Sequence, residues 1–192
     1  MNKKGVNIFN KSKITISGLG GVGKGTVAKL LSEKLNFKYL SGGDFFRNMA
    51  EELNLSLYDF DQFVKKNPEY DLKLDQMQEK YGQKNENFVL ESRLGWHFIP
   101  DSFKIRLDCD NEVRYKRILG RDGSTVKEIK TNEKERFNAI VERYKALYKL
   151  EDFLNENNFN YIIDSTNLTP EEVVENILKE YFKLINKNTW IK

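Results

Sequence analysis

The chain has 192 residues, 39% of them hydrophobic and 32% charged, and its 32 lysines and arginines nearly balance its 29 aspartates and glutamates. This length predicts one compact domain, and a net charge of +3 gives no reason to expect a nucleic-acid partner. One cysteine, Cys109, excludes an intrachain disulfide, one histidine argues against a zinc site, and no apolar run approaches the roughly 20 residues that a membrane helix needs. We therefore expect a cytoplasmic monomer without a membrane partner.

Patterns typical of strands and helices alternate along the chain. The predicted strands are 13–17, 38–40, 87–91, 103–108 and 159–164. The predicted helices are 24–36, 43–54, 57–67, 70–81, 111–121, 126–157 and 169–186. The last helix should be capped by Thr169 and start at Pro170. The alternation predicts an α/β fold of three αβα layers around a five-stranded, mainly parallel sheet, with ligands at the carboxyl ends of the strands.

The first predicted strand runs into GLGGVGKGT, Gly18–Thr26, which nearly fits the phosphate-loop pattern G-x-x-x-x-G-K-[ST]. Glycines let backbone N–H groups wrap a phosphate, and the N-terminus of the following helix adds unpaired donors. Lys24 can place a positive charge on the β- and γ-phosphates, so we expect it to be catalytic as well. The predicted ATP-binding residues of the loop are Gly18, Gly20, Gly21, Val22, Gly23, Lys24, Gly25 and Thr26.

The end of this loop departs from the common pattern, because Gly25 stands where a Ser or Thr hydroxyl would ligate magnesium. The sequence GKGT resembles the loop of nucleoside monophosphate kinases, which commonly reads G-x-P-G-x-G-K-G-T. That resemblance implies that magnesium is held through water and by the substrate phosphates. Gly20 departs from the family, which usually has a small residue or proline there, and predicts a more flexible loop.

The segment after the second predicted strand, SGGDFFR, resembles the S-x-G-[DE]-x-[FL]-R stretch of cytidylate kinases, most closely the short archaeal type. The resemblance implies that Ser41 contacts the acceptor nucleotide, that Arg47 grips its phosphate, and that Asp44 orders waters around magnesium. The residues alone also permit a plain helix cap made by Ser41 and Asp44, with Arg47 on a solvated face.

The third predicted strand ends in LESR, which resembles the family's L-E-G-R. An acidic residue just past an apolar strand suits magnesium or its water shell, so Glu91 joins Asp44 as a predicted metal residue acting through water. The resemblance implies that Arg93 binds the acceptor. The alternative is that Glu91 and Arg93 are ordinary surface residues.

Two groups of arginines follow. Arg117 and Arg121 match the arginines at the start of a kinase lid, and Arg136 and Arg143 match the family's R-x6-R-Y. The resemblance implies that Arg117 and Arg121 bind ATP, that Arg136 and Arg143 bind the acceptor, and that Arg121, Arg136 and Arg143 are catalytic. Arg114 shares the face of Arg117, and we expect it to be a solvated surface charge.

The sequence leaves open which residue recognises the acceptor base. Bacterial cytidylate kinases carry an aspartate shortly after the first arginine of the R-x6-R pair, whereas this chain reads RFNAIVER there. Asn138 could substitute for that aspartate.

The resemblance covers 14–178 and implies a single P-loop kinase domain. It comprises an insert at about 43–86 that binds the nucleoside monophosphate, a lid at about 117–145 and a flexible tail at 1–12. The implied reaction is ATP- and Mg2+-dependent phosphorylation of CMP or dCMP to CDP or dCDP.

Three alternatives compete with this interpretation. The nearest is another small-molecule P-loop kinase, such as an adenylate or uridylate kinase. A GTPase-type switch would need Ser or Thr at position 25 and an N-K-x-D motif, and the sequence has neither. A non-catalytic nucleotide-binding module would need neither an acceptor-side arginine nor a lid.

Overall fold

The computed structural model describes residues 10–67, 69–122 and 126–189, and the side chains of some helical residues, Arg121 and Arg136 among them, lie outside the description. The strands are β1 (Lys13–Ser17), β2 (Lys38–Ser41), β3 (Phe88–Glu91), β4 (Phe103–Asp108) and β5 (Tyr161–Asp164). The helices are α1 (Lys24–Leu35), α2 (Gly42–Glu52), α3 (Leu57–Lys66), α4 (Glu69–Lys84), α5 (Gly95–Phe98), α6 (Asn111–Asp122), α7 (Val126–Tyr148), the short 3-10 helix η1 (Glu156–Asn158) and α8 (Pro170–Thr189).

The five strands form one sheet in the order β2-β3-β1-β4-β5, and every neighbouring pair is parallel. This confirms the predicted five-stranded α/β fold, with a wholly parallel sheet. β1 lies at the centre and all five of its residues are buried, as expected for a strand covered on both faces. Because the strands are parallel, Ser17, Ser41, Glu91 and Asp108 mark the same edge of the sheet.

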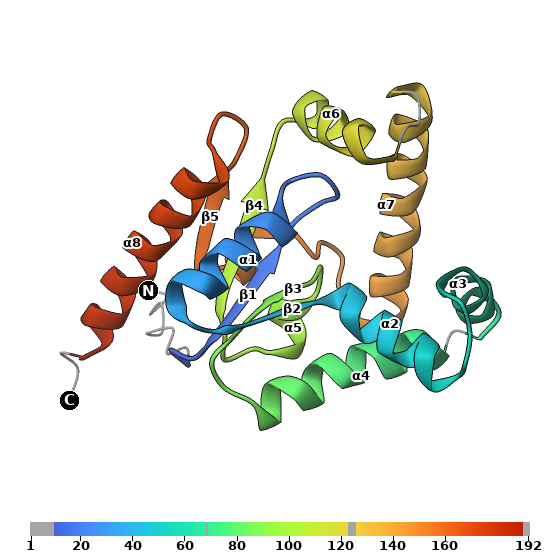
Figure 1. Cartoon of the computed structure of the whole chain (residues 1–192), viewed down its shortest axis with the longest axis horizontal. Coiled ribbons are helices and arrows are strands. Elements are labelled where there is room, and N and C mark those ends of the chain that lie inside the picture. Colours follow the sequence, from blue (N-terminus) through green and yellow to red (C-terminus); the bar gives the residue numbers. More distant parts are fainter. Residues whose placement is uncertain (1–9, 68, 123–125, 190–192) are drawn as a thin grey trace.

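Helices cover both faces of the sheet and complete the three layers (Figure 1). On one face, α1 and α8 pack over Ile14, Ile16 and Ile105. On the other face, α2, α3 and α4 pack over Phe88 and Leu90. A third apolar cluster, which includes Trp96, Tyr144 and Phe153, joins α7 to α5 and to the chain after α7. α6 and α7 therefore stand beside the carboxyl edge of the sheet (Figure 1).

The prediction of one helix over 126–157 was wrong for residues 149–157, because α7 ends at Tyr148. Lys149 adopts a left-handed φ of 58°, its N–H donates to the Lys145 carbonyl, and the Leu150 N–H donates to the Tyr144 carbonyl. This closure satisfies the last carbonyls of the helix. The chain then turns back so that Phe153 joins the buried cluster of Trp96, which is a long-range contact that the helical pattern did not contain.

The chain before β1 is attached to the fold where the structure describes it. The Asn10 N–H donates to the Asp101 carbonyl at 2.5 Å, and the Tyr181 hydroxyl donates to the Lys11 carbonyl. Of the tail predicted at 1–12, Asn10 and Lys11 thus make contacts with the fold, and residues 1–9 lie outside the described residues. Within the described ranges, no helix combines the length and the apolar character that crossing a membrane would require.

Phe103 and Phe182 provide a matched test of this core. Phe103 on β4 is 0% exposed, whereas Phe182 on α8 is 49% exposed. We expect Phe103→Ala to lower the free energy of unfolding by about 3–5 kcal/mol because it leaves a cavity between the sheet and Tyr181. Phe182→Ala should cost less than about 1 kcal/mol. Urea unfolding of both variants measures the difference, and equal costs would contradict the described core.

Candidate functional site

The phosphate loop follows β1 and has a conformation that requires glycine. Gly18, Gly21 and Gly23 have φ values of 144°, 80° and 96°. A Cβ on Gly18 would lie 2.5 Å from the Leu107 carbonyl oxygen, and a Cβ on Gly21 would lie 2.5 Å from that of Arg114. β4, through Leu107, and α6, through Arg114, thus pack directly against the loop backbone. The first free N–H groups of α1 and the Lys24 side chain end up at the carboxyl edge of the sheet.

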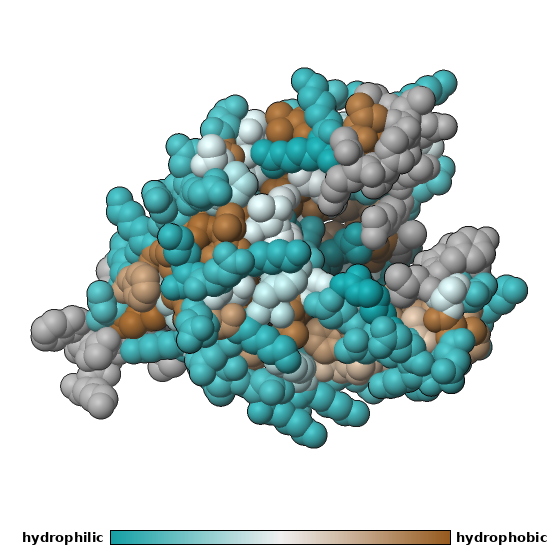
Figure 2. Space-filling model, viewed as in Figure 1, coloured by the Kyte–Doolittle hydropathy of each residue, from teal (hydrophilic) through white to brown (hydrophobic). Residues whose placement is uncertain are grey.

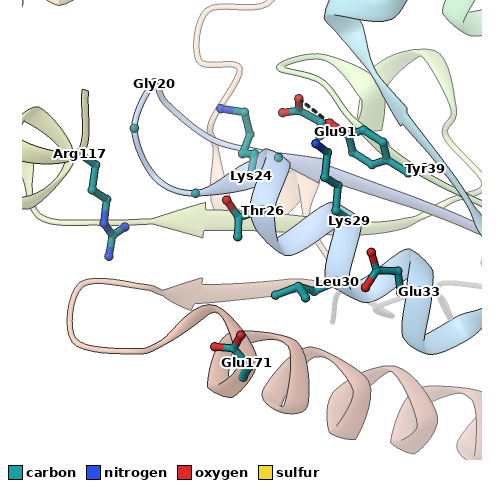
Figure 3. A pocket seen from close by; sticks show the side chains of 13 residues that line it. Gly20, Lys24, Thr26, Lys29, Leu30, Glu33, Tyr39, Glu91, Arg117 and Glu171 are labelled. Atoms are coloured by element: carbon teal, nitrogen blue, oxygen red, sulfur yellow. Dashed lines mark hydrogen bonds between the residues drawn. The ribbon is translucent and has the colours of Figure 1, made fainter. Parts of the chain in front are cut away.

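A cavity of about 830 Å3 opens over this loop, and we call it the loop cavity. It is lined by Gly20, Gly21, Gly23, Lys24, Gly25, Thr26, Lys29, Leu30, Glu33, Tyr39, Glu91, Arg117 and Glu171. Figure 3 shows Lys24 and Glu91 on one side of the loop and Arg117 reaching it from the other. The Lys24 ammonium donates to the Leu19 carbonyl at 2.7 Å, which holds it over the loop.

Gly25 has room for a side chain, so packing does not force a glycine at this position. A Cβ there would meet no atom closer than Glu91 Oε1 at 3.6 Å and the Tyr39 hydroxyl at 3.7 Å. The Tyr39 hydroxyl donates to Glu91 Oε1 at 3.4 Å. The space beside Gly25, where the common pattern has a hydroxyl, therefore faces the Glu91 carboxylate.

The charge of Glu91 depends on two opposing effects. Burial raises the pKa of the Glu91 carboxyl, and the nearby Lys24 ammonium opposes that rise. Burial and the Glu91 charge together raise the pKa of Tyr39 to about 12, so the phenol stays protonated and can keep donating to Glu91. Lys24 and Glu91 thus bring opposite charges near each other at the carboxyl end of the central strands.

A second cavity of about 430 Å3 lies against the first, and we call it the insert cavity because α2 and α4 supply part of its wall. It is lined by Lys24, Gly42, Gly43, Phe46, Leu74, Asp75, Gln78, Glu91, Ser92, Arg93, Leu94, Arg143 and Tyr144. Lys24 and Glu91 line both cavities. Four residues singled out from the sequence, Lys24, Glu91, Arg93 and Arg143, therefore meet at one place. In the view of Figure 2 the surface is largely hydrophilic and is hollowed between α1 and α7.

Ser41, Asp44 and Arg47 lie beside the insert cavity rather than in its wall. Ser41 caps α2 in a capping box: its hydroxyl accepts from the Asp44 N–H at 3.1 Å, and Asp44 Oδ2 accepts from the Ser41 N–H at 2.8 Å. Arg47 donates to Asp44 Oδ1. Partial burial by itself would raise the pKa of Asp44, but the hydrogen bonds from Ser41 and Arg47 outweigh it and lower that pKa.

Two polar residues of α4 that no sequence motif singled out, Asp75 and Gln78, line the insert cavity. Asp75 Oδ2 accepts from Arg143 Nη2 at 2.9 Å and from the Tyr148 hydroxyl at 2.6 Å. Gln78 Nε2 donates to Asp75 Oδ1 at 3.4 Å. The sequence pattern that could have indicated them is their place on the same face of α4 as Leu74, which belongs to the buried core. Asn138, the expected substitute for a missing aspartate, is exposed.

Arg117 closes the loop cavity from the side of β5. Its Nη2 donates to the Ser165 carbonyl at 3.0 Å, and its Nη1 approaches Cys109 Sγ at 3.4 Å and the Ser165 hydroxyl at 3.3 Å. The side chains of Arg121 and Arg136 lie outside the described residues, so their predicted roles stay predictions.

Arg114 was predicted to be a solvated charge, and that was wrong. It is 6% exposed. Its Nη1 donates to the Gly20 carbonyl at 3.0 Å and to Glu133 Oε2 at 2.8 Å, so it connects the phosphate loop to α7. A Cβ on Gly20 would lie 2.7 Å from Glu133 Oε2. The sequence indicated only that Gly20 would make the loop more flexible. In the structure, Gly20 is the point at which the Glu133 carboxylate of α7 contacts the loop.

Comparison with protein families matches residues 14–138 to a family described as an AAA domain. A cytidylate kinase of Archaeoglobus fulgidus is 39% identical over 87% of this chain and 93% of its own length. Further archaeal cytidylate kinases are 32–35% identical. An S-adenosylmethionine-dependent nucleotide dehydratase of Lacinutrix mariniflava is 35% identical over 90% of this chain, which matches 36% of that protein.

Solved structures agree with the fold. A shikimate kinase from Aquifex aeolicus has a TM-score of 0.57 and 20% identity, over 92% of this chain and 98% of that one. An identity this low supports the three-layer αβα fold alone.

The contact between Gly20 and Glu133 can be tested by a double-mutant cycle. We expect Gly20→Ala to cost about 1–3 kcal/mol of unfolding free energy, because the new methyl group displaces a carboxylate that Arg114 holds in place. In a Glu133→Ala background the same change should cost less than half as much. Urea unfolding measures both costs.

Gly25→Ala is the matched control in the same loop. Its methyl group would meet only ordinary contacts of 3.6 Å and longer, so it should change stability by less than about 0.5 kcal/mol. An equal cost of Gly20→Ala with and without Glu133 would contradict the docking of Glu133 on the loop.

Proposed function

This chain belongs to the archaeal-type cytidylate kinase family, and on that premise we propose that it transfers the γ-phosphoryl group of ATP to CMP or dCMP, giving ADP and CDP or dCDP. The observation that carries the proposal is the meeting of two cavities at Lys24 and Glu91. A kinase needs one site for each nucleotide and a single point at which their phosphates meet. The loop cavity suits the donor, and the insert cavity suits the acceptor.

On the donor side, the loop amides, the N-terminus of α1 and Lys24 bind the phosphates of ATP. Beside the loop lies a hollow of about 180 Å3 lined by Val22, Gly23, Thr26, Val27, Arg117, Ser165, Leu168, Pro170 and Val173. Its mixture of apolar walls and a guanidinium suits a flat purine base, which stacks on cations and apolar surface. Arg117 therefore serves the donor nucleotide.

On the acceptor side, Arg93 and Arg143 bring two guanidinium groups to the wall of the insert cavity. Guanidinium groups bind phosphate oxygens in a bidentate manner, which would fix the acceptor phosphate beside Lys24. Arg47, Asp44 and Ser41 stand next to Gly42 and Gly43 of the same wall, and we assign Arg47 to the acceptor phosphate as well.

The chemical step needs charge stabilisation more than acid–base catalysis. An oxygen of the acceptor phosphate, already an anion, forms the new bond to the γ-phosphorus as the bond to the β,γ-bridging oxygen breaks. No proton has to be removed, and ADP leaves with the negative charge. Lys24, Arg121, Arg136 and Arg143 stabilise the transferring group and exclude water from it.

The site fits a magnesium ion held mainly through water and phosphate oxygens. Magnesium binds oxygen ligands and uses one or two carboxylates together with substrate phosphates. Glu91 lines both cavities, and each Asp44 oxygen keeps a second lone pair for a water. Among the described residues, no group of three or more His, Cys, Asp or Glu side chains is placed to hold a metal alone. When bound, the ion would neutralise charge on the β- and γ-phosphates.

A panel of acceptors tests the proposed reaction. Formation of ADP from ATP is followed with AMP, CMP, dCMP, UMP and GMP under identical conditions with Mg2+. We expect CMP or dCMP to give the highest kcat/KM. A higher value for AMP or UMP would show another nucleoside monophosphate kinase, and turnover with none of them would favour a non-catalytic nucleotide-binding module.

Comparing alanine variants of Lys24 and Lys34, both on α1, distinguishes a role in catalysis from a general effect of removing a positive charge. Lys24 lines both cavities, whereas Lys34 is exposed in the last turn of the helix. We expect Lys24→Ala to lower kcat by at least about 100-fold, because a charge at the transferring phosphoryl group is lost. Lys34→Ala should leave kcat within about twofold. Similar turnover in both variants would refute the assigned role of Lys24.

A further inference from the structure

The wall that α4 gives to the insert cavity differs from the rest of its lining. Lys24, Arg93 and Arg143 supply cations to the cavity, whereas α4 supplies Leu74, Asp75 and Gln78. Phe46 of α2 adds an aromatic side chain to the cavity wall. A wall with apolar surface and a few fixed polar groups is typical of a site for a flat heterocycle, whose faces are apolar and whose edges carry hydrogen-bonding atoms.

The polar groups of this wall are deeply buried. Asp75 is 9% exposed and Gln78 is 6% exposed. The carbonyl oxygen of Gln78, Oε1, is buried and accepts no hydrogen bond from the described residues. A buried acceptor without a donor costs free energy, so such groups are rare and call for an explanation. A ligand that enters the cavity and donates a hydrogen bond to Gln78 would provide one.

Asp75 decides which end of the Gln78 amide is available. Its Oδ2 accepts from Arg143 and Tyr148, and its Oδ1 faces Gln78 Nε2 at 3.4 Å. A carboxylate accepts hydrogen bonds and donates none, so an amide turned the other way would set Oε1 against a negative charge. Asp75 therefore keeps the NH2 group on its own side and leaves the carbonyl oxygen as the group that a ligand can use.

We propose that Gln78, oriented by Asp75, selects the acceptor base by accepting a hydrogen bond from its exocyclic amino group. The inference deepens the proposed function and rests on it. Cytosine has an amino group at C4, whereas uracil has an oxygen there that can only accept. Uracil would set two acceptors against each other in a buried place, and a site built for a donor rejects a ligand that lacks it. Gln78 thus discriminates CMP from UMP.

A purely structural role makes a different prediction. If Asp75 and Gln78 served only to join α4 to Arg143 and Tyr148 of α7, substitutions would lower stability and change turnover with every acceptor alike. A base-selecting role changes the ratio between acceptors that differ only at the amino position. The ratio of kcat/KM for CMP to that for UMP is therefore the decisive readout.

The test compares Gln78→Met with Gln83→Met. Methionine keeps the length of the side chain and removes the amide, and Gln83 is an exposed residue of the same helix that bonds only Glu79 among the described contacts. We expect Gln78→Met to lower the CMP-to-UMP ratio about tenfold, the effect of about one lost hydrogen bond to a buried partner. Gln83→Met should leave it within twofold.

Asp75→Asn is a second variant, which releases the Gln78 amide and also removes the ion pair with Arg143. An asparagine can accept or donate, so the Gln78 amide is free to turn, and UMP should gain relative to CMP although both reactions slow down. This variant also decides the matter if Gln78→Met does not fold. A CMP-to-UMP ratio that stays within twofold of the wild-type value in each folded variant would overturn the proposal.

The same measurements separate this proposal from the proposed function. If the wild-type protein prefers CMP and the ratio is unchanged in the variants, the base-selecting role alone fails. If the wild-type protein prefers AMP, the proposed function fails, and Gln78 is then judged by the ratio of AMP to IMP, which differ in an amino and an oxo group. A wild-type preference for UMP would refute both.

Discussion

The arrangement of the site depends on how closely other backbone can approach the phosphate loop. The carbonyl oxygens of Leu107 and Arg114 lie 2.5 Å from the positions of a Cβ on Gly18 and Gly21. Only glycine permits this contact, and the contact sets β4 and α6 directly against the loop. Lys24 then starts α1 at the carboxyl edge of the sheet, where Glu91 arrives from β3. The two cavities meet there because these elements converge on one backbone.

α7 connects this loop to the opposite side of the site. Glu133 docks on Gly20 through Arg114, and Arg143 pairs with Asp75 on α4. These two ion pairs lie ten residues apart along one helix, so a shift of α7 would act on the donor loop and the acceptor wall together. The Arg114–Glu133 pair is largely shielded from water, whereas in the second pair Asp75 is buried and Arg143 is 30% exposed, so removing either arginine would leave a poorly solvated carboxylate. Arg114, which was expected on the surface, can be buried because the Glu133 carboxylate and the Gly20 carbonyl accept its hydrogen bonds.

Gly25 and Gly20 illustrate two different reasons for a glycine. A Cβ on Gly25 would make only ordinary contacts of 3.6 Å and longer, to Glu91 and Tyr39, so packing leaves the position unconstrained. Gly20 is constrained by a side chain more than a hundred residues away in the sequence. Long-range packing thus constrains the glycine at position 20 and does not constrain the one at position 25.

The sequence by itself determined the fold class, the order of the five strands and of the longer helices along the chain, and the loop with Lys24, because these follow from local periodicity and from a short motif; it did not predict the one-turn helix α5. It also singled out Glu91 at the end of β3, Arg93 just after it and Arg143 on α7, all of which line the insert cavity. Only the tertiary structure decided the end of α7 at Tyr148, the burial of Arg114, and the place of Asp75 and Gln78 in the cavity wall. Each of these depends on contacts between residues far apart in the chain, and local patterns carry no record of such contacts.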